Sequence, residues 1–254
     1  ERALTEEAQI AMKEGTNRIL RYGTGSPYLD VRLPCGGGID LHVDVNINRA
    51  ELQRAIALGR ARRRFSMTFD PAATRTSFRV DSETFETPDG HFTRRFDPKL
   101  RIVLAGRGWE IVAMSQLAQT ADAELVVASQ EPATLEFCRP YADRLIQLTV
   151  PRAVPDLPLD ADTAVACLFH EHEWEGELLL KALRSQAFYV GALGSRQTQR
   201  ARAEALTALG ATQDEMARLK GPIGLFPSQD PRSLAVSALA EIIKVRTSGS
   251  GGTQ

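Results

Sequence analysis

From residue 100 onward, short apolar runs alternate with stretches of helical periodicity, and this alternation constrains the fold more than any other feature of the sequence. The apolar runs cover 102–105, 125–128, 145–148, 165–169 and 188–190. The helical stretches cover about 109–119, 133–138, 174–185, 196–209 and 231–245. Apolar runs of this length predict buried strands, and their alternation with helices predicts an α/β fold: a parallel sheet with helices on both faces.

A glycine turn joins the first of these strands to the first helix. The run 100–105 leads directly into Gly106-Arg107-Gly108-Trp109. A strand, a Gly-x-Gly turn and a helix are typical of a Rossmann-like dinucleotide-binding domain, because the glycines let the backbone turn tightly and approach a phosphate at the positive end of the helix. Arg107 could pair with that phosphate or be an ordinary solvent-exposed loop residue.

Two features of the first two strands and their connections disfavour NAD(P) as a ligand. The third glycine position of the dinucleotide-binding pattern is occupied by Ile111. The second strand ends without the acidic residue that normally binds the ribose hydroxyls, and the nearest acid is Glu131. The sequence therefore predicts the Rossmann-like fold more strongly than it predicts nicotinamide binding.

The first 97 residues have a different character and predict a smaller α+β domain. We expect a helix over 3–14, strands over 18–22 and 39–45, a helix from Asn48 to Gly59, and strand-like structure over 62–96 with a turn at Pro88-Asp89-Gly90. Large apolar residues are expected to fill the core of its sheet: Phe65, Met67, Phe69, Phe78, Phe85, Phe92 and Phe96. The predicted domains are thus 1–97 and 98–246, followed by a flexible tail over 247–254.

Charge and cysteine content narrow the class of protein. Lys and Arg number 31 and Asp and Glu number 32, so the chain lacks the basic excess of a nucleic-acid binder. The arginines at 60 and 62–64 are interpreted as a solvated strand edge. Three cysteines do not make a disulfide framework, which favours the cytoplasm, and no apolar run is long enough to span a membrane. Cys138 and Cys167 lie in apolar patterns and are expected in the core.

Two histidines follow the apolar run 165–169. His170 and His172 alternate with Glu171 and Glu173 at the start of a helical stretch. Because ligands bind outside the carboxyl ends of strands in an open parallel sheet, these histidines lie where a ligand is expected. They could contact an anionic cofactor or hold a metal, or the segment could serve as an acidic first turn of the helix.

A second turn with binding potential follows the last strand. Gly194, Ser195 and Arg196 directly precede a helical stretch. A serine that caps the helix, free backbone amides and an arginine make a plausible phosphate cradle. The alternative is a plain strand-to-helix connection with a serine cap. No nucleophile-elbow pattern surrounds Ser195, so hydrolase chemistry is not expected.

A third candidate lies in the N-terminal domain, where Cys35 is followed by Gly36, Gly37 and Gly38. A thiol in a glycine turn is accessible, and neighbouring backbone amides can lower its pKa. Such a thiolate could bind a soft metal or carry sulfur. A small residue in a tight turn is the equally weighted alternative.

Together these segments resemble the XdhC/CoxI family, the accessory proteins of xanthine dehydrogenase-type molybdoenzymes. The matching pieces occur in the family's order across nearly the whole chain: Leu33–Ile39, Gly106-x-Gly108, His170–His172, Phe188–Thr198, Gly221–Leu225 and Ser237–Ile242. The strings Tyr-Val-Gly-Ala-Leu-Gly-Ser-Arg and Pro-Cys-Gly-Gly are the specific ones. The resemblance also implies that the chain begins inside the family's first domain.

The resemblance implies a role in cofactor insertion rather than a reaction catalysed by the chain itself. Members bind molybdenum cofactor, promote its sulfuration with a cysteine desulfurase, and help to insert it into a xanthine dehydrogenase-type enzyme; a homodimer is expected. On this interpretation Cys35 contacts the metal end of the cofactor beside Gly36 and Gly37. The residues expected to cradle its phosphate or line the crevice are Gly106, Arg107, Gly108, His170, His172, Gly194, Ser195 and Arg196.

Two other functions remain open at this point. The same Rossmann-like domain could serve an NAD(P)-dependent oxidoreductase, although no Tyr-Lys or Cys-His catalytic arrangement is evident. A divergent member of the family could instead act only as a scaffold for its client enzyme. Because one fold can serve all three functions, the fold does not decide among them.

Overall fold

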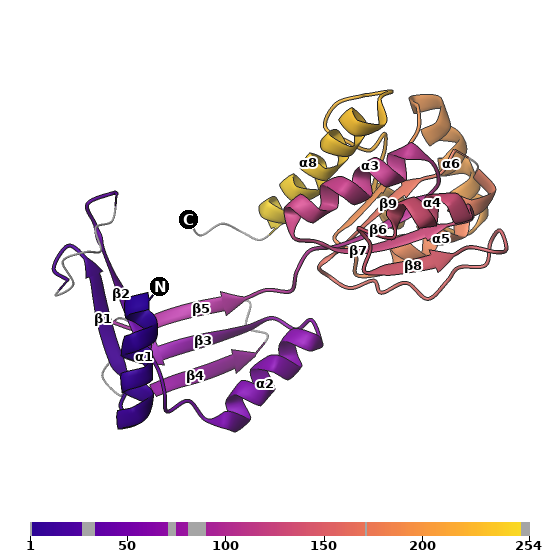
Figure 1. Ribbon diagram of the computed structural model, residues 1–254. Coiled ribbons are helices and arrows are strands. Elements are labelled where there is room, and N and C mark those ends of the chain that lie inside the picture. Colours follow the sequence, from indigo (N-terminus) through magenta and orange to yellow (C-terminus); the bar gives the residue numbers. More distant parts are fainter. Residues whose placement is uncertain (1, 27–33, 71–74, 81–89, 171, 250–254) are drawn as a thin grey trace. The chain divides into compact units, whose positions relative to one another are not determined.

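The computed structural model describes residues 2–26, 34–70, 75–80, 90–170 and 172–249 (Figure 1). Contacts divide the chain into two compact units, Glu1–Pro98 and Lys99–Gln254. We call these the first and the second unit and describe each by itself. The division falls one residue after the expected domain boundary.

The described part of the first unit contains two helices and two small antiparallel sheets. Its elements are α1 (Arg2–Glu14), β1 (Arg18–Gly23), β2 (Gly38–Val43), α2 (Arg49–Arg60), β3 (Phe65–Asp70), β4 (Arg75–Val80) and β5 (Phe92–Phe96). Strands β1 and β2 form one sheet, and the other has the order β4-β3-β5. Helix α2 begins where expected, because the Asn48 side chain accepts a hydrogen bond from the Ala50 amide.

Some expectations for the first unit are wrong. Phe65 and Phe69 are buried in β3, but Phe92, predicted to be a core residue, is 62% exposed at the first position of the edge strand β5. The basic cluster is not a strand edge: Arg60 ends α2, and the following arginines lie in the connection to β3. The expected turn at 88–90 and Phe85 lie largely outside the described residues.

The second unit confirms the predicted parallel sheet. Its strands are β6 (Arg101–Gly106), β7 (Glu124–Ser129), β8 (Arg144–Gln147), β9 (Thr163–Leu168), β10 (Tyr189–Ala192) and β11 (Leu219–Lys220). Its helices are α3 (Trp109–Ala118), the short 3-10 helix η1 (Gln119–Ala121), α4 (Pro132–Cys138), α5 (His172–Arg184), α6 (Arg196–Ala208), α7 (Gln213–Ala217) and α8 (Pro231–Gly249). The strand order is β11-β10-β9-β6-β7-β8, and every pair is parallel.

Alternation along the strands builds a core on each face of this sheet. Ile102 and Leu104 of β6 belong to one core, with buried residues of α3 and α8. Val103 and Ala105 belong to the other, with buried residues of α5 and α6. All six residues of β6 and of β9 are buried, as expected for central strands covered on both faces. Cys138 and Cys167 are also fully buried.

The C-terminal part of the second unit differs from the prediction in two ways. Helix α7 and the two-residue strand β11 were not predicted, because both are too short to give a periodic signal. Helix α8 continues to Gly249, so the segment that begins at Thr247 starts as helix rather than as a tail.

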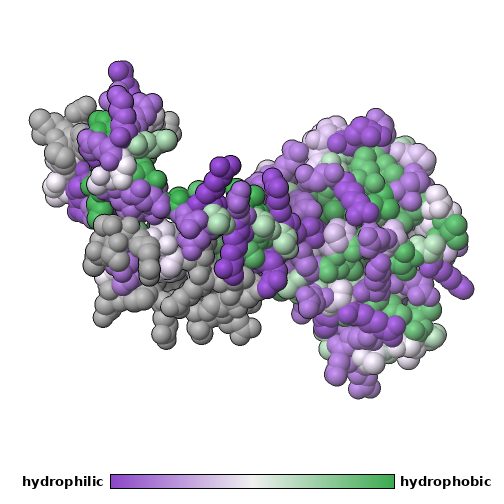
Figure 2. Space-filling view, turned by 90° about the horizontal axis from the view of Figure 1, so that it is seen from below, coloured by the Kyte–Doolittle hydropathy of each residue, from purple (hydrophilic) through white to green (hydrophobic). Residues whose placement is uncertain are grey.

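The surface of the second unit is mixed. Figure 2 shows separate hydrophobic patches among hydrophilic residues on one of its faces. Exposed large apolar residues of this unit include Trp109, Phe137 and Phe226. None of the helices in the described part of the chain combines the length and the hydropathy that crossing a bilayer requires.

The ring of His42 generates a prediction for the first unit. It stacks on Phe69, and burial lowers its pKa below the ordinary value of 6.5, against the opposing effects of Asp44 and the Arg18 backbone. As pH drops below about 6.5, the ring takes up a proton more readily in the unfolded state than in the folded state. The free energy of unfolding is therefore highest above this pH and decreases below it. The free energy of unfolding, measured by urea titration from pH 8 to pH 5.5, should fall more for the wild type than for His42→Phe, which keeps the stack. Equal pH dependence in the two proteins would contradict this.

Candidate functional site

The candidate site lies at the carboxyl edge of the parallel sheet. Strands β6 and β9 are neighbours, and the chain continues from them toward opposite edges of the sheet. This arrangement is a topological switch point, where open parallel sheets bind their ligands. Four segments follow strands at this edge: 106–108 after β6, Gln130 after β7, 169–170 after β9 and 193–196 after β10.

The first glycine of the turn after β6 serves strand packing. Gly106 has φ +150°, and a Cβ on it would lie 2.5 Å from the backbone oxygen of Leu168 at the end of β9. Only glycine therefore lets the two central strands come this close at the switch point. Arg107, which follows it, is partly buried.

The second glycine of this turn is held by the protein itself. Gly108 has φ +85° and is the N-cap of α3. Its amide donates to the Thr134 hydroxyl at 3.0 Å. The Thr134 hydroxyl in turn donates to the carboxylate of Glu131, and Thr134 is 2% exposed. Glu131, the nearest acid after the second strand, thus stabilises the glycine turn through Thr134.

A carboxylate and an imidazole face each other at the switch point. His170 Nε2 lies 3.6 Å from Glu110 Oε1 in the first turn of α3. The side chain of His170 is 54% exposed and that of Glu110 is 20% exposed. His172 is the first residue of α5, and Glu171 lies outside the described residues. Among the described residues, no three side chains of the metal-binding types gather.

The turn after β10 combines a capped helix start with an exposed cation. Ser195 is the N-cap of α6, and its Oγ accepts from the Thr198 amide at 3.2 Å. Gly194 has φ +130° and would clash with Thr198 if it carried a Cβ. Arg196, the first residue of α6, is exposed and makes no hydrogen bond or ion pair with the described residues. A free guanidinium at the positive end of a helix can bind an anion.

A buried ion pair beneath this turn was missed by sequence reasoning. Arg202 of α6 is 1% exposed, and its Nε and Nη2 donate to the two carboxylate oxygens of Glu175 at 3.0 and 2.9 Å. Its Nη2 also donates to the Leu193 backbone oxygen at 2.7 Å, and its Nη1 to Gln199 Oε1 at 2.6 Å. Because Glu175 lies in the first turn of α5, this guanidinium connects the His170–His172 segment to the Gly194–Arg196 turn. The only sequence signal was an arginine on the apolar side of α6.

A second loop supports the turn after β10 from the side of β11. The Ile223 amide donates to the Ala192 oxygen at 3.0 Å. The Gly224 amide donates to the Glu241 carboxylate at 2.8 Å, and this carboxylate also accepts from the Tyr189 hydroxyl. Burial raises the pKa of Tyr189 well above its ordinary value, so the hydroxyl stays protonated and remains a donor. The segment Gly221–Leu225 therefore braces β10.

Cys35 belongs to the first unit, whereas all the other predicted site residues except Gly36 and Gly37 belong to the second. It is exposed in the loop between β1 and β2. The loop is fixed at its base by Thr24, whose amide donates to Gly37 and whose hydroxyl donates to Gly36. The glycine turn thus presents the thiol to solvent.

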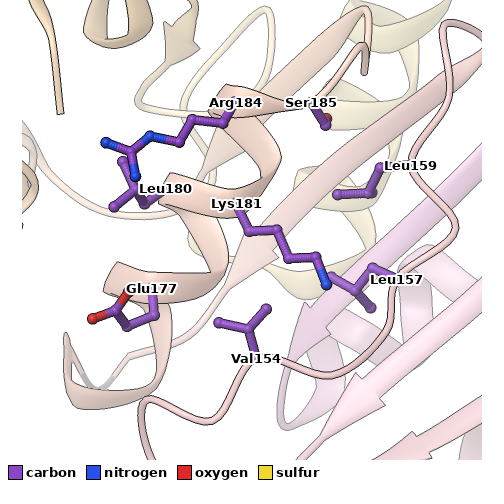
Figure 3. Close-up of a pocket in the computed structure, with 8 residues that line it drawn as sticks. All are labelled: Val154, Leu157, Leu159, Glu177, Leu180, Lys181, Arg184 and Ser185. Atoms are coloured by element: carbon purple, nitrogen blue, oxygen red, sulfur yellow. The ribbon is translucent and has the colours of Figure 1, made fainter.

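A cavity of about 530 Å³ lies elsewhere in the second unit, between α5 and residues 154–159 (Figure 3). Lys181 extends from α5 toward Leu157, and its ammonium donates to the Pro155 oxygen at 2.8 Å. Arg184 donates to Glu215 and to the Gly210 oxygen. Both cations at this cavity are thus held by the protein, and no predicted site residue lines it.

Comparisons with known proteins agree with this architecture. Residues 102–242 match the family model described as the XdhC Rossmann domain. The chain is 31% identical to the molybdenum cofactor insertion chaperone PaoD of Escherichia coli over 97% of this chain and 71% of that protein. It is 25% identical to a probable xanthine dehydrogenase subunit of Bacillus subtilis, over 64% of this chain and 48% of that protein.

A solved structure resembles the fold of the chain. The crystal structure of a xanthine dehydrogenase from Bacillus halodurans superposes with a TM-score of 0.69 and 21% sequence identity. The match covers 99% of this chain and 82% of the other. At this identity the likeness concerns the fold alone.

The buried ion pair generates a prediction about stability. Arg202→Met leaves the Glu175 carboxylate buried without its partner, and we expect the free energy of unfolding to fall by about 3–5 kcal/mol. The matched control is Arg200→Met on the exposed side of the same helix, for which a change within about 0.5 kcal/mol is expected. The double variant Glu175→Leu/Arg202→Met should recover most of the loss. Urea titrations that show equal effects at positions 200 and 202 would refute this assignment.

Proposed function

Because the chain belongs to the XdhC family, we propose that it is an accessory protein that binds molybdenum cofactor as cargo and delivers it to a xanthine dehydrogenase-type molybdoenzyme. The relatives' names support this role, since one is a molybdenum cofactor insertion chaperone and another a probable xanthine dehydrogenase subunit. Sulfuration of the cargo with a cysteine desulfurase, a homodimer and a cytoplasmic location belong to the same proposal.

The observation that carries the proposal is the open anion site at the start of α6. Molybdenum cofactor carries a phosphate, and Arg196 is a cation without a partner among the described residues beside the capping Ser195. The turn lies two strands from β6, about 10 Å across the sheet, and so lies at the same edge as the switch point. The buried Arg202 holds it in place from below. We therefore assign the phosphate of the cargo to Ser195 and Arg196.

The polar groups at this edge of the sheet suit the binding of a cargo better than the catalysis of a reaction. His170 is paired with Glu110, and Ser195 is engaged as a helix cap. Neither is arranged with a general base and an oxyanion site as nucleophilic catalysis requires. The chain accordingly acts by holding and releasing the cofactor.

Cys35 is proposed to contact the molybdenum end of the cargo. Its thiol is exposed in a glycine turn, as a group that handles a metal or sulfur must be. Burial of the other two cysteines leaves Cys35 as the exposed thiol among the described residues. This role concerns the first unit and is tested separately from the phosphate site on the second unit.

The phosphate assignment is tested by titrating the full chain with molybdenum cofactor released from a donor enzyme. Arg196→Ala should raise the Kd at least tenfold, because one charge-assisted hydrogen bond to phosphate is worth about 1.5–3 kcal/mol. Arg200→Ala removes the same charge one turn further along α6 and should leave the Kd within about twofold. Equal effects of the two substitutions would show that only the general charge of α6 matters.

The role of Cys35 is tested with Cys35→Ala and Cys35→Ser. Because the side chain is exposed, the thermal midpoint should stay within a few degrees of the wild type. Activation of an apo-molybdoenzyme loaded by the chain should fall at least tenfold in both variants, since neither supplies a thiolate. Full client activation by either variant would remove Cys35 from the mechanism.

A further inference from the structure

We propose that Glu110 is a specificity-determining residue that excludes the pyrophosphate of dinucleotides from the glycine turn after β6. The inference concerns which ligands this Rossmann domain rejects. It therefore stands apart from the cargo assigned to the turn after β10, and either can be right without the other.

The Glu110 carboxylate lies where a bound pyrophosphate would have to approach the backbone. In dinucleotide-binding domains the second glycine lacks a side chain so that the pyrophosphate can approach the backbone. Here Glu110 Oε2 lies 3.3 Å from the point that a Cβ on Gly108 would occupy. A carboxylate thus fills the space that the glycine leaves open. A pyrophosphate at that point would meet a negative charge at close range.

The second step is the loss of hydrogen-bond donors. The Gly108 amide, which would face a phosphate, already donates to Thr134. The Thr134 hydroxyl is in turn committed to Glu131. The positive end of α3 also has an acid of its own in its first turn, which is Glu110. The Gly108 amide is therefore committed within the protein, and a negative charge already lies at this helix start.

The third step is what keeps Glu110 in place. His170 Nε2, at the end of β9, lies 3.6 Å from its Oε1, a distance at which a protonated imidazole would attract the carboxylate across the switch point. Gln130 follows β7, at the position where dinucleotide-binding domains carry the acid for the ribose hydroxyls. The two anchor points of a bound dinucleotide are thus altered together, one at the pyrophosphate and one at the ribose.

The test is a titration of the full chain with NADH, with inorganic pyrophosphate as a competing probe. Glu110→Gln keeps the shape of the side chain and removes its charge. We expect saturable NADH binding with a Kd at least tenfold lower than in the wild type, and competition by pyrophosphate. Glu110→Ala is the second variant and should show the same gain. Thermal unfolding of each variant shows that the domain is folded.

The matched control is Glu173→Gln, which removes one negative charge from the first turn of α5 at the same edge of the sheet. It should bind NADH no better than the wild type. The proposal is overturned if the wild type binds NADH as tightly as Glu110→Gln, or if Glu173→Gln gains as much affinity. It is also overturned if both folded Glu110 variants fail to gain affinity.

Discussion

The buried ion pair between Arg202 and Glu175 is the interaction on which the candidate site depends. A charge pair that is 1% and 3% exposed has lost its hydration, so it is tolerated only because its hydrogen bonds are complete. The guanidinium completes them by binding the carboxylate, the Gln199 side chain and the Leu193 backbone oxygen. Those partners come from α5, α6 and the turn after β10. One buried cation therefore fixes the relative positions of the segments that border the crevice.

The two helix N-termini at this edge of the sheet differ. At the start of α3, Thr134 takes the Gly108 amide and Glu110 supplies a negative charge. The start of α6 is open, because Ser195 caps the helix while Arg196 remains available to an anion. On the proposed assignment, this Rossmann domain keeps its fold while the anion site lies at the end of β10 instead of the end of β6. The glycine turn retains its packing role at Gly106.

The sequence predicted the parts of the structure that follow from periodicity. The parallel sheet, its covering helices and the burial of Cys138 and Cys167 were recovered, because each rests on a local apolar pattern. The Gly-x-Gly turn lies where the sequence placed it, and its role in binding a phosphate stays a prediction. The sequence could not show that the Gly108 amide donates to Thr134, which is 26 residues away, or that the Glu110 side chain lies over Gly108. Arg202 was missed for the same reason, since a lone arginine on a helix is usually a surface residue.

We propose that the carboxyl edge of the sheet binds molybdenum cofactor at the start of α6 and not at the start of α3. Hydrogen–deuterium exchange of the full chain, with and without cofactor released from a donor enzyme, tests it most directly. We expect slower exchange in peptides that cover 193–200 and unchanged exchange in peptides that cover 106–112. Protection of 106–112 in place of 193–200 would contradict it, and so would cofactor binding that protects neither segment.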